Sequence, residues 1–183
     1  MIYTEITPNP SSLKFVVDTT FLTHGSADFP DVNSTTDAPL ARKLFDFTFV
    51  DRVFIGTNFV TITKTDGFQW EELIPVIKDF LKAFFAQGIA PLTGKYTEMM
   101  QPVVDPEDDE VTAKIKSYLD SHVRPAVAGD GGDIIFDSFD EGVLKLRLQG
   151  SCSGCPSSTI TLKRGIETLL TRMVPEVKSV EAV

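Results

Sequence analysis

The sequence predicts an α+β protein of two small domains, each a small sheet packed with helices, joined by an acidic linker that contains proline. Two observations place the boundary. Residues 102–110 hold five acids, two prolines and no Lys or Arg. Of the 14 Phe, only two lie beyond this run. Strand-like and helix-like patterns alternate on both sides of it, so we expect domains at residues 1–101 and 111–183, with the linker at 102–110.

The first domain opens with a turn at residues 7–10, where two prolines flank an asparagine. Residues 12–18, which include Leu13, Phe15, Val16 and Val17, then predict a strand. Asp37 is positioned to cap a short helix over residues 39–45, whose first residue is proline. The β-branched residues of 59–63 predict a second strand. We find no chemical motif in this part of the chain.

A longer amphipathic helix is predicted over residues 71–86, with Pro75 in its first turn. Its apolar positions recur at helical spacing and are Leu73, Ile77, Leu81 and Phe84. The order strand, helix, strand, helix indicates a small α/β or α+β domain.

Two helices are predicted in the second domain. The first has one apolar face, formed by Val111, Ile115, Leu119 and His122. The second follows the cysteines and has an apolar stripe of Leu162, Ile166, Leu169 and Met173. On this pattern His122 is a packed histidine rather than a metal ligand.

Three strands accompany these helices. The glycine-rich residues 129–133 break the chain before a strand over residues 134–136. Leucines alternate with charged residues over 144–148, as in a half-buried strand. Residues 177–183 predict a closing strand. The second domain is therefore expected to be a three-stranded sheet with two helices.

Composition excludes several classes of protein. With 42% hydrophobic and 23% charged residues among 183, the chain is typical of a globular protein and unlike a disordered one. A net charge of −9 argues against nucleic-acid binding, which needs a basic surface. No apolar run approaches the roughly 18 residues of a membrane span. We expect neither nucleic acid nor a membrane as a partner.

The cysteine content and the first residues bear on location. Two cysteines exclude a disulfide-rich secreted scaffold and suit a reducing compartment. The first residues resemble neither a secretory signal nor an Arg-rich transit peptide. We therefore expect a bacterial cytoplasm, with the mitochondrial matrix as the alternative.

Both cysteines lie in one short segment, Gly150–Ser158, between a predicted strand and a predicted helix. Pro156 suits the first position of that helix, which places Cys155 at or beside its N-cap. Unpaired N–H groups and the positive end of the helix dipole are then expected to favour the thiolate forms of Cys152 and Cys155. The glycines allow the backbone to approach a bulky inorganic group. The segment suits an anionic cofactor bound by thiolates.

Four interpretations of the cysteine pair are open at this point. Both could be buried apolar residues, although a loop rich in Gly and Ser gives no reason for that role. A redox dithiol of thioredoxin type also opens a helix, but here Ser153 and Gly154 separate the cysteines instead of Gly-Pro. A structural zinc site needs four ligands, and the only histidines, His24 and His122, lack zinc-finger spacing. An iron–sulfur cluster typically takes four Cys thiolates, so two chains would share one cluster.

Asp130 and Asp133 are the other candidates for a metal or general-base site. Clusters of Asp and Gly usually form turns, because Asp hydrogen-bonds its own backbone and Gly adopts positive φ. We interpret both carboxylates as turn formers.

The cysteine segment and its surroundings resemble the C-terminal domain of NifU-like (Nfu-type) iron–sulfur carrier proteins. The residues that carry this resemblance are Gly150–Ser158, Val123–Ala126, Asp130–Asp133 and Thr161–Glu167. The first half resembles the N-terminal domain of the same family through Thr7–Pro10, Leu13–Phe15, Leu40–Ala41, Leu44–Phe45, Val53–Gly56 and Phe59–Lys64. Residues 19–37, rich in Thr, Ser and Asp, match no pattern of the family.

The resemblance implies a two-domain carrier that is not an enzyme. It implies that Cys152 and Cys155 bind a [4Fe–4S] cluster, one per homodimer, at the interface between two chains. The cluster would come from an upstream assembly scaffold and pass to apo iron–sulfur acceptor proteins. The N-terminal domain would serve partner interaction and tuning. The alternative is an enzyme, a thiol–disulfide oxidoreductase that uses the same cysteine pair.

Overall fold

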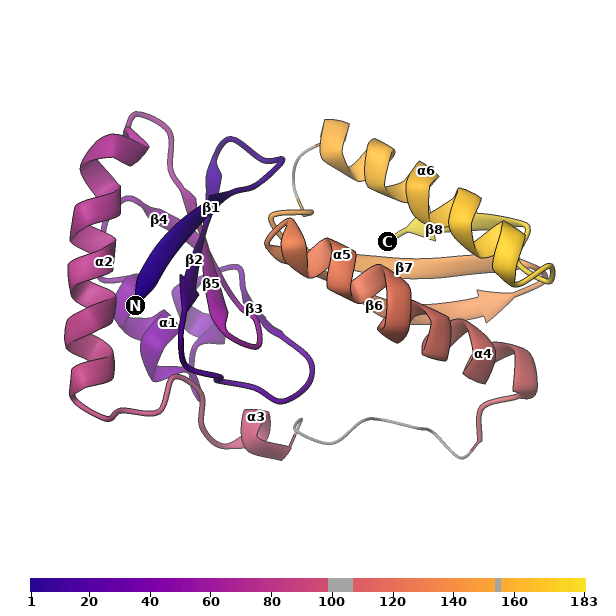
Figure 1. The fold of residues 1–183 in the computed structure, drawn as a ribbon, viewed down its shortest axis with the longest axis horizontal. Coiled ribbons are helices and arrows are strands. Elements are labelled where there is room, and N and C mark those ends of the chain that lie inside the picture. Colours follow the sequence, from indigo (N-terminus) through magenta and orange to yellow (C-terminus); the bar gives the residue numbers. More distant parts are fainter. Residues whose placement is uncertain (99–106, 154–155) are drawn as a thin grey trace. The chain divides into compact units, whose positions relative to one another are not determined.

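A computed structural model of the chain describes residues 1–98, 107–153 and 156–183. The chain forms two compact units, Met1–Pro102 and Val103–Val183 (Figure 1). Each unit is a sheet packed with helices, which confirms the predicted α+β class and the two small domains. Residues 102–106 of the predicted linker lie outside the described residues. Among the helices of the described residues, none has the length and apolar character needed to cross a membrane.

The N-terminal unit is built on a five-stranded antiparallel sheet with the strand order β1-β2-β5-β4-β3. Its strands are β1 (Ile2–Ile6), β2 (Ser12–Val17), β3 (Ala27–Phe29), β4 (Val50–Ile55) and β5 (Phe59–Lys64). Its helices are the short 3₁₀ segment η1 (Val32–Ser34), α1 (Pro39–Leu44), α2 (Trp70–Ala86) and α3 (Lys95–Glu98). Helices α1 and α2 lie on one face of the sheet (Figure 1), and their apolar side chains share one core with those of the strands.

Phenylalanine dominates the core of this unit. The side chains of Phe15, Phe29 and Phe84 are at most 1% exposed. Phe21 stacks on Phe85 with ring centroids 5.2 Å apart, and both rings line a pocket of about 430 Å³. The stretch from residue 19, which matched no family pattern, therefore contributes to this pocket as well as to β3.

Local patterns predicted β2, β5 and α2 to within one residue at each end, whereas β1, β3 and β4 were not predicted. Two details were wrong. Pro75 lies in the second turn of α2, because that helix begins at Trp70. The N-cap of α1 is Ala38 and makes no side-chain cap, so Asp37 does not cap the helix. The carbonyl of Asp37 instead accepts the N–H of Thr93 at 2.8 Å.

The C-terminal unit has a three-stranded sheet with the strand order β6-β7-β8. The strands are β6 (Gly132–Asp140), β7 (Val143–Gly150) and β8 (Ser179–Ala182). The helical segments are α4 (Glu110–Tyr118), the π-helical turn η2 (Leu119–Val123), α5 (Arg124–Gly129) and α6 (Pro156–Met173). β6 and β7 form an antiparallel hairpin, and α6 crosses over to β8, which runs parallel to β7. This is the predicted three-stranded unit, with α4, η2 and α5 continuous as its first helical segment.

The π-helical turn changes which side chains of the first helical segment reach the core. A π turn holds more residues than an α turn, so it shifts the positions that follow Leu119 around the helix. Val123 and Val127 enter the core. His122 is exposed and stacks on Tyr118 with ring centroids 4.3 Å apart. The prediction that His122 packs in the apolar face was wrong.

Helix α6 buries only part of its predicted apolar stripe. Ile166 and Leu170 belong to the core, and Leu162 packs against it. Leu169 and Met173 are 37% and 45% exposed, so the predicted stripe was wrong at these two positions.

Candidate metal centre

Cys152 lies in the short connection between β7 and α6. β7 ends at Gly150, whose φ of +69° is a conformation that glycine adopts without strain. Ser153 closes the following turn, because its N–H and its Oγ both donate to the carbonyl of Gly150, at 3.1 and 2.8 Å. In the first turn of α6, Thr159 Oγ1 donates to the carbonyl of Cys152 at 3.2 Å. The end of the strand and the start of the helix together hold Cys152 in place.

The start of β6 lies directly against the sulfur. Gly132 pairs with Gly150 in the β6–β7 ladder. A Cβ atom on Gly132 would lie 2.6 Å from Cys152 Sγ and 2.6 Å from the carbonyl oxygen of Gln149, closer than non-bonded atoms approach. Glycine at position 132 therefore allows the sulfur to pack against the β6 backbone.

Ser151 links the cysteine segment to the turn between α5 and β6. Its Oγ donates to the carbonyl of Asp130, and its N–H donates to the carbonyl of Gly131 at 3.3 Å. Gly131 has a φ of +80°, as expected for the residue that follows the end of a helix. The α5–β6 turn, the end of β7 and the start of α6 thus meet around Cys152.

Burial raises the pKa of the Cys152 thiol to about 11. The residue is only 4% exposed, and loss of water disfavours the charged thiolate. The hydroxyl of Ser151 lowers the pKa in part, while the charges of Asp130 and Asp133 raise it further. The thiol is therefore protonated at neutral pH when it binds no metal. The expectation that the helix start favours a thiolate was wrong for Cys152, because burial of the sulfur raises the pKa.

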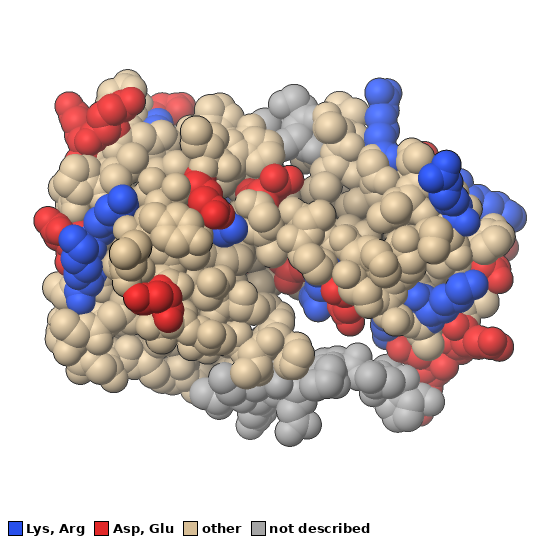
Figure 2. Space-filling view, in the orientation of Figure 1, with Lys and Arg blue, Asp and Glu red and all other residues tan. Residues whose placement is uncertain are grey.

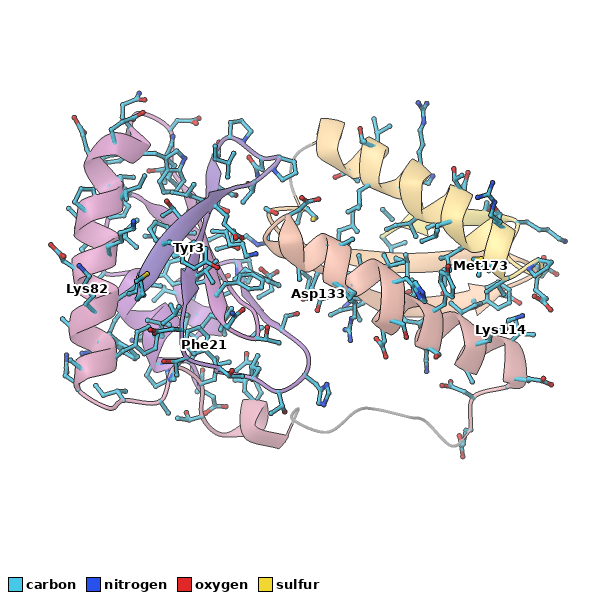
Figure 3. The ribbon with its side chains drawn as sticks, viewed as in Figure 1. Tyr3, Phe21, Lys82, Lys114, Asp133 and Met173 are labelled. Atoms are coloured by element: carbon cyan, nitrogen blue, oxygen red, sulfur yellow. The ribbon has the colours of Figure 1, made fainter. Side chains whose placement is uncertain are left out.

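Asp133 is not a turn former. It lies in β6 (Figure 3) and is 7% exposed. Its Oδ1 accepts the N–H of Ile134 at 2.8 Å and lies 3.2 Å from Nε of Arg124. This pairing offsets the free-energy cost of burying the Asp133 carboxylate, since an unpaired buried charge is costly. Asp130, by contrast, is the C-cap of α5 and does lie in the predicted turn.

Cys155 lies outside the described residues, so its pairing with Cys152 stays a prediction. Helix α6 does begin at Pro156, as the sequence predicted. The described residues contain no group of three or more His, Cys, Asp and Glu that could hold a metal ion. The two histidines do not change this, because His24 belongs to the N-terminal unit and His122 stacks on a tyrosine.

Sequence reasoning missed three residues that shape this site, namely Gly132, Ser151 and Arg124. All three lay within the segments that resembled the family, which was the available signal. Their roles depend on the pairing of β6 with β7 and on the fold of the α5–β6 turn. Neither can be inferred from the spacing of the cysteines.

Comparison with known proteins covers both units. Residues 2–88 match the family model for the N-terminal part of scaffold protein Nfu/NifU, and residues 115–181 match the NifU-like domain. The human protein named NFU1 iron-sulfur cluster scaffold homolog, mitochondrial, is 45% identical over 183 residues, which cover 100% of this chain and 71% of that protein. The chain belongs to the Nfu/NifU family.

Further Nfu/NifU relatives occur in plants and insects. NifU-like protein 4, mitochondrial, of Arabidopsis thaliana is 45% identical over 98% of this chain and 65% of its own length. The Drosophila ananassae NFU1 homolog is 42% identical over 100% of this chain and 64% of its own length. The chain thus spans slightly less than two thirds of these two relatives. The solved structure of the Staphylococcus aureus protein SAV1430 is 19% identical over 40% of this chain and 89% of its own length, with a TM-score of 0.36.

Proposed function

We propose that this Nfu/NifU family member carries a [4Fe–4S] cluster, held by Cys152 and Cys155 of two chains, and delivers it to apo iron–sulfur proteins. The observation that supports this most directly is the setting of Cys152, whose sulfur packs against the Gly132 backbone in the short connection that leads into α6. The human and insect relatives are named iron–sulfur cluster scaffolds. In this proposal the cluster is cargo, and the chain catalyses no reaction.

The number of ligands requires a homodimer. A [4Fe–4S] cluster typically takes four Cys thiolates, and each chain has two cysteines. A shared site also provides a route for release. Each iron–sulfur bond to a carrier cysteine is replaced by a bond to an acceptor thiolate, so the cluster leaves intact and the two chains can separate.

The raised pKa of Cys152 suits a temporary ligand. Loading a cluster requires the buried thiol to give up its proton. When an acceptor thiolate takes over the iron, Cys152 takes a proton back and returns to its favoured neutral form. Reprotonation of Cys152 therefore favours release of the cluster. A ligand that holds its cluster permanently would gain nothing from a raised pKa.

The proposal also covers where the protein acts and what the N-terminal unit does. The relatives named above are mitochondrial by name, which favours the mitochondrial matrix and leaves the expected bacterial cytoplasm without support. The N-terminal unit contains no cysteine, so we assign it to partner interaction and tuning. An upstream assembly scaffold would supply the cluster.

Anaerobic reconstitution with iron and sulfide tests the proposal. We expect a brown dimer with one cubane cluster per two chains, measured by iron and sulfide content together with the mass in solution. Incubation with an apo-acceptor should then activate the acceptor even in the presence of a strong iron chelator. A monomer that holds a complete cluster without added thiol contradicts the shared site. Transfer that the chelator abolishes contradicts the carrier role. A colourless protein that cycles between dithiol and disulfide supports the oxidoreductase alternative.

A further inference from the structure

The surface of α6 is basic in an acidic protein. The helix contains Lys163, Arg164 and Arg172 and a single acid, Glu167, whereas the whole chain carries a net charge of −9. The Glu167 carboxylate contacts β8 instead, where its Oε2 accepts the N–H of Val180 at 2.9 Å. None of the three basic side chains forms an ion pair with a described residue. Figure 2 shows Lys and Arg side chains gathered over the region that α6 occupies in Figure 1.

Apolar side chains lie on the same exposed surface. Leu169 and Met173 are 37% and 45% exposed, and Met173 lies at the far end of α6 (Figure 3). Gly165 is also exposed. A Cβ atom there would meet nothing within 4 Å, so packing within the unit does not require glycine at this position. Glycine destabilises a helix relative to alanine, and Gly165 does so without a packing role among the described residues.

These residues form two adjacent rows at four-residue spacing, which we call the α6 ridge. One row is basic and polar and consists of Arg164, Thr168 and Arg172. The row beside it begins with glycine and is then apolar, and consists of Gly165, Leu169 and Met173. At a rise of about 1.5 Å per residue, the ridge extends from about 12 to about 26 Å beyond the first residue of α6. It therefore starts about two helical turns beyond the cysteine segment and runs away from it.

We propose that the α6 ridge is the docking surface for the protein that receives the cluster, and that this protein presents carboxylates beside an apolar patch. The proposal rests on the proposed carrier function. Carboxylates of the partner can form ion pairs with Arg164 and Arg172 of the basic row. An apolar side chain or backbone segment can approach closely at Gly165, where no side chain intervenes, and cover Leu169.

A second copy of the chain does not fit the ridge. In a two-fold symmetric contact along α6, Arg164 and Arg172 of one chain would face the same residues of the other. Like charges opposed across an interface are costly. Two chains that share a cluster through their cysteine segments are therefore not expected to meet ridge to ridge, and an acidic acceptor is the better fit.

Charge reversal on the cluster-loaded full chain tests the ridge. The test variant carries Arg164→Glu and Arg172→Glu, and the matched control carries Lys114→Glu and Lys145→Glu, which make the same charge change on α4 and β7. Two acceptors are used: the apo form of an acidic [4Fe–4S] ferredoxin, and a neutral synthetic peptide with the four cysteines of a cluster loop. We expect the ridge variant to transfer its cluster to the ferredoxin about tenfold more slowly, with the control and the peptide reactions nearly unchanged.

Gly165→Ala provides a second readout. It should raise the melting temperature by a few degrees, because alanine favours the helix and meets no neighbour. It should also slow transfer to the ferredoxin, because the new methyl group occupies the space of the partner. A purely structural role for Gly165 predicts the rise in melting temperature without the slower transfer, and that result would overturn its part in docking.

The outcomes separate the ridge from the carrier function. If the ridge variant slows transfer to the ferredoxin and to the peptide equally, or if the control slows transfer as much, the ridge is not a docking surface. If the wild-type chain holds no cluster, the carrier function fails, and docking is then measured as the Kd of the cluster-free chain for labelled apo-ferredoxin. A Kd raised about tenfold by the ridge variant alone supports docking, and an unchanged Kd rejects it.

Discussion

Twelve of the 14 Phe lie in the N-terminal unit, whereas both cysteines lie in the C-terminal unit. The close ring pairs follow the same division, because only the Tyr118–His122 stack lies in the second unit among the described residues. The second core is mainly aliphatic and includes Cys152 itself. The N-terminal core is filled by large aromatic side chains. Beside Cys152 the chain has glycine instead, because the backbone lies close to the sulfur there.

Charged pairs join neighbouring strands in both units, as Lys14 does with Glu5 at 2.7 Å between β2 and β1, and Arg147 with Asp137 at 2.8 Å between β7 and β6. The C-terminal unit also has a charged pair beside its site, because Arg124 pairs with Asp133 next to the turn that contacts the cysteine segment. We therefore expect substitutions in the N-terminal unit to alter only the stability of that unit. Substitutions around the cysteine segment should alter cluster binding.

The largest expected effect is complete loss of the cluster. Cys152→Ser or Cys155→Ser removes two of the four thiolates of a dimer, and a hydroxyl is a harder and far less acidic ligand than a thiol. Iron and sulfide per chain after anaerobic reconstitution should fall close to zero. Cys152→Ala is the matched control for folding, because it keeps the buried position apolar. A serine variant that retained full iron content would show that other ligands hold the cluster.

A core variant in the N-terminal unit should lose stability but keep its cluster, the opposite of the cysteine variants. Phe29 is fully buried in β3, with its ring 5.7 Å from that of Tyr96. Phe29→Ala should lower the free energy of unfolding of this unit by about 3–5 kcal/mol. Cluster content should stay unchanged. Tyr3→Ala at an exposed position (Figure 3) is the control and should change stability little. Parallel loss of iron in the Phe29 variant would mean that the units are coupled.

A methyl group at Gly132 should affect both stability and the site. Gly132→Ala forces the Cys152 sulfur or the Gln149 carbonyl to move, because the new Cβ would lie 2.6 Å from each. Overpacking of this kind costs about 1–3 kcal/mol, and cluster content should fall with it. Gly129→Ala is the matched control, since a Cβ there meets nothing within 4 Å. Normal cluster loading in a folded Gly132→Ala protein would show that the close approach of backbone and sulfur is dispensable.

The elements that local sequence determined were predicted well. Strands β2 and β5 are rich in apolar and β-branched residues, and α2 has a clear helical period, so no distant partner was needed to recognise them. β3 has only three residues and exists through its pairing with β4. His122 was misplaced because the π turn changes the helical period, and residue spacing gives no sign of such a turn.

The candidate site also has features that the sequence predicted and features that depend on the fold. The position of the cysteines before a helix that starts at Pro156 was readable from the sequence. The protonation of Cys152 was not, because it depends on burial produced by Gly132 and the α5–β6 turn. Asp133 was taken for a turn former because its partner, Arg124, lies nine positions earlier in the chain and meets it only in the fold.

The smallest expected effect is a loss of stability at high pH in the metal-free protein. The Cys152 thiol has a pKa of about 11 in the fold against an ordinary value of 9.0. Because the folded state favours the neutral thiol, this stabilisation is complete below pH 9 and is lost progressively between pH 9 and pH 11. At pH 10 the free energy of unfolding should be about 1.4 kcal/mol lower than at pH 7 through this group alone.

Urea unfolding of the metal-free wild type and of Cys152→Ala, each at pH 7 and pH 10, measures this effect. All other ionisable groups are present in both proteins, so their contributions cancel in the comparison. The wild type should lose about 1.4 kcal/mol more than the alanine variant over this interval. An equal loss in the two proteins would mean that Cys152 titrates as an exposed thiol. The C-terminal unit would then lack the buried, protonated cysteine that distinguishes it from the N-terminal unit, and release by reprotonation would no longer follow.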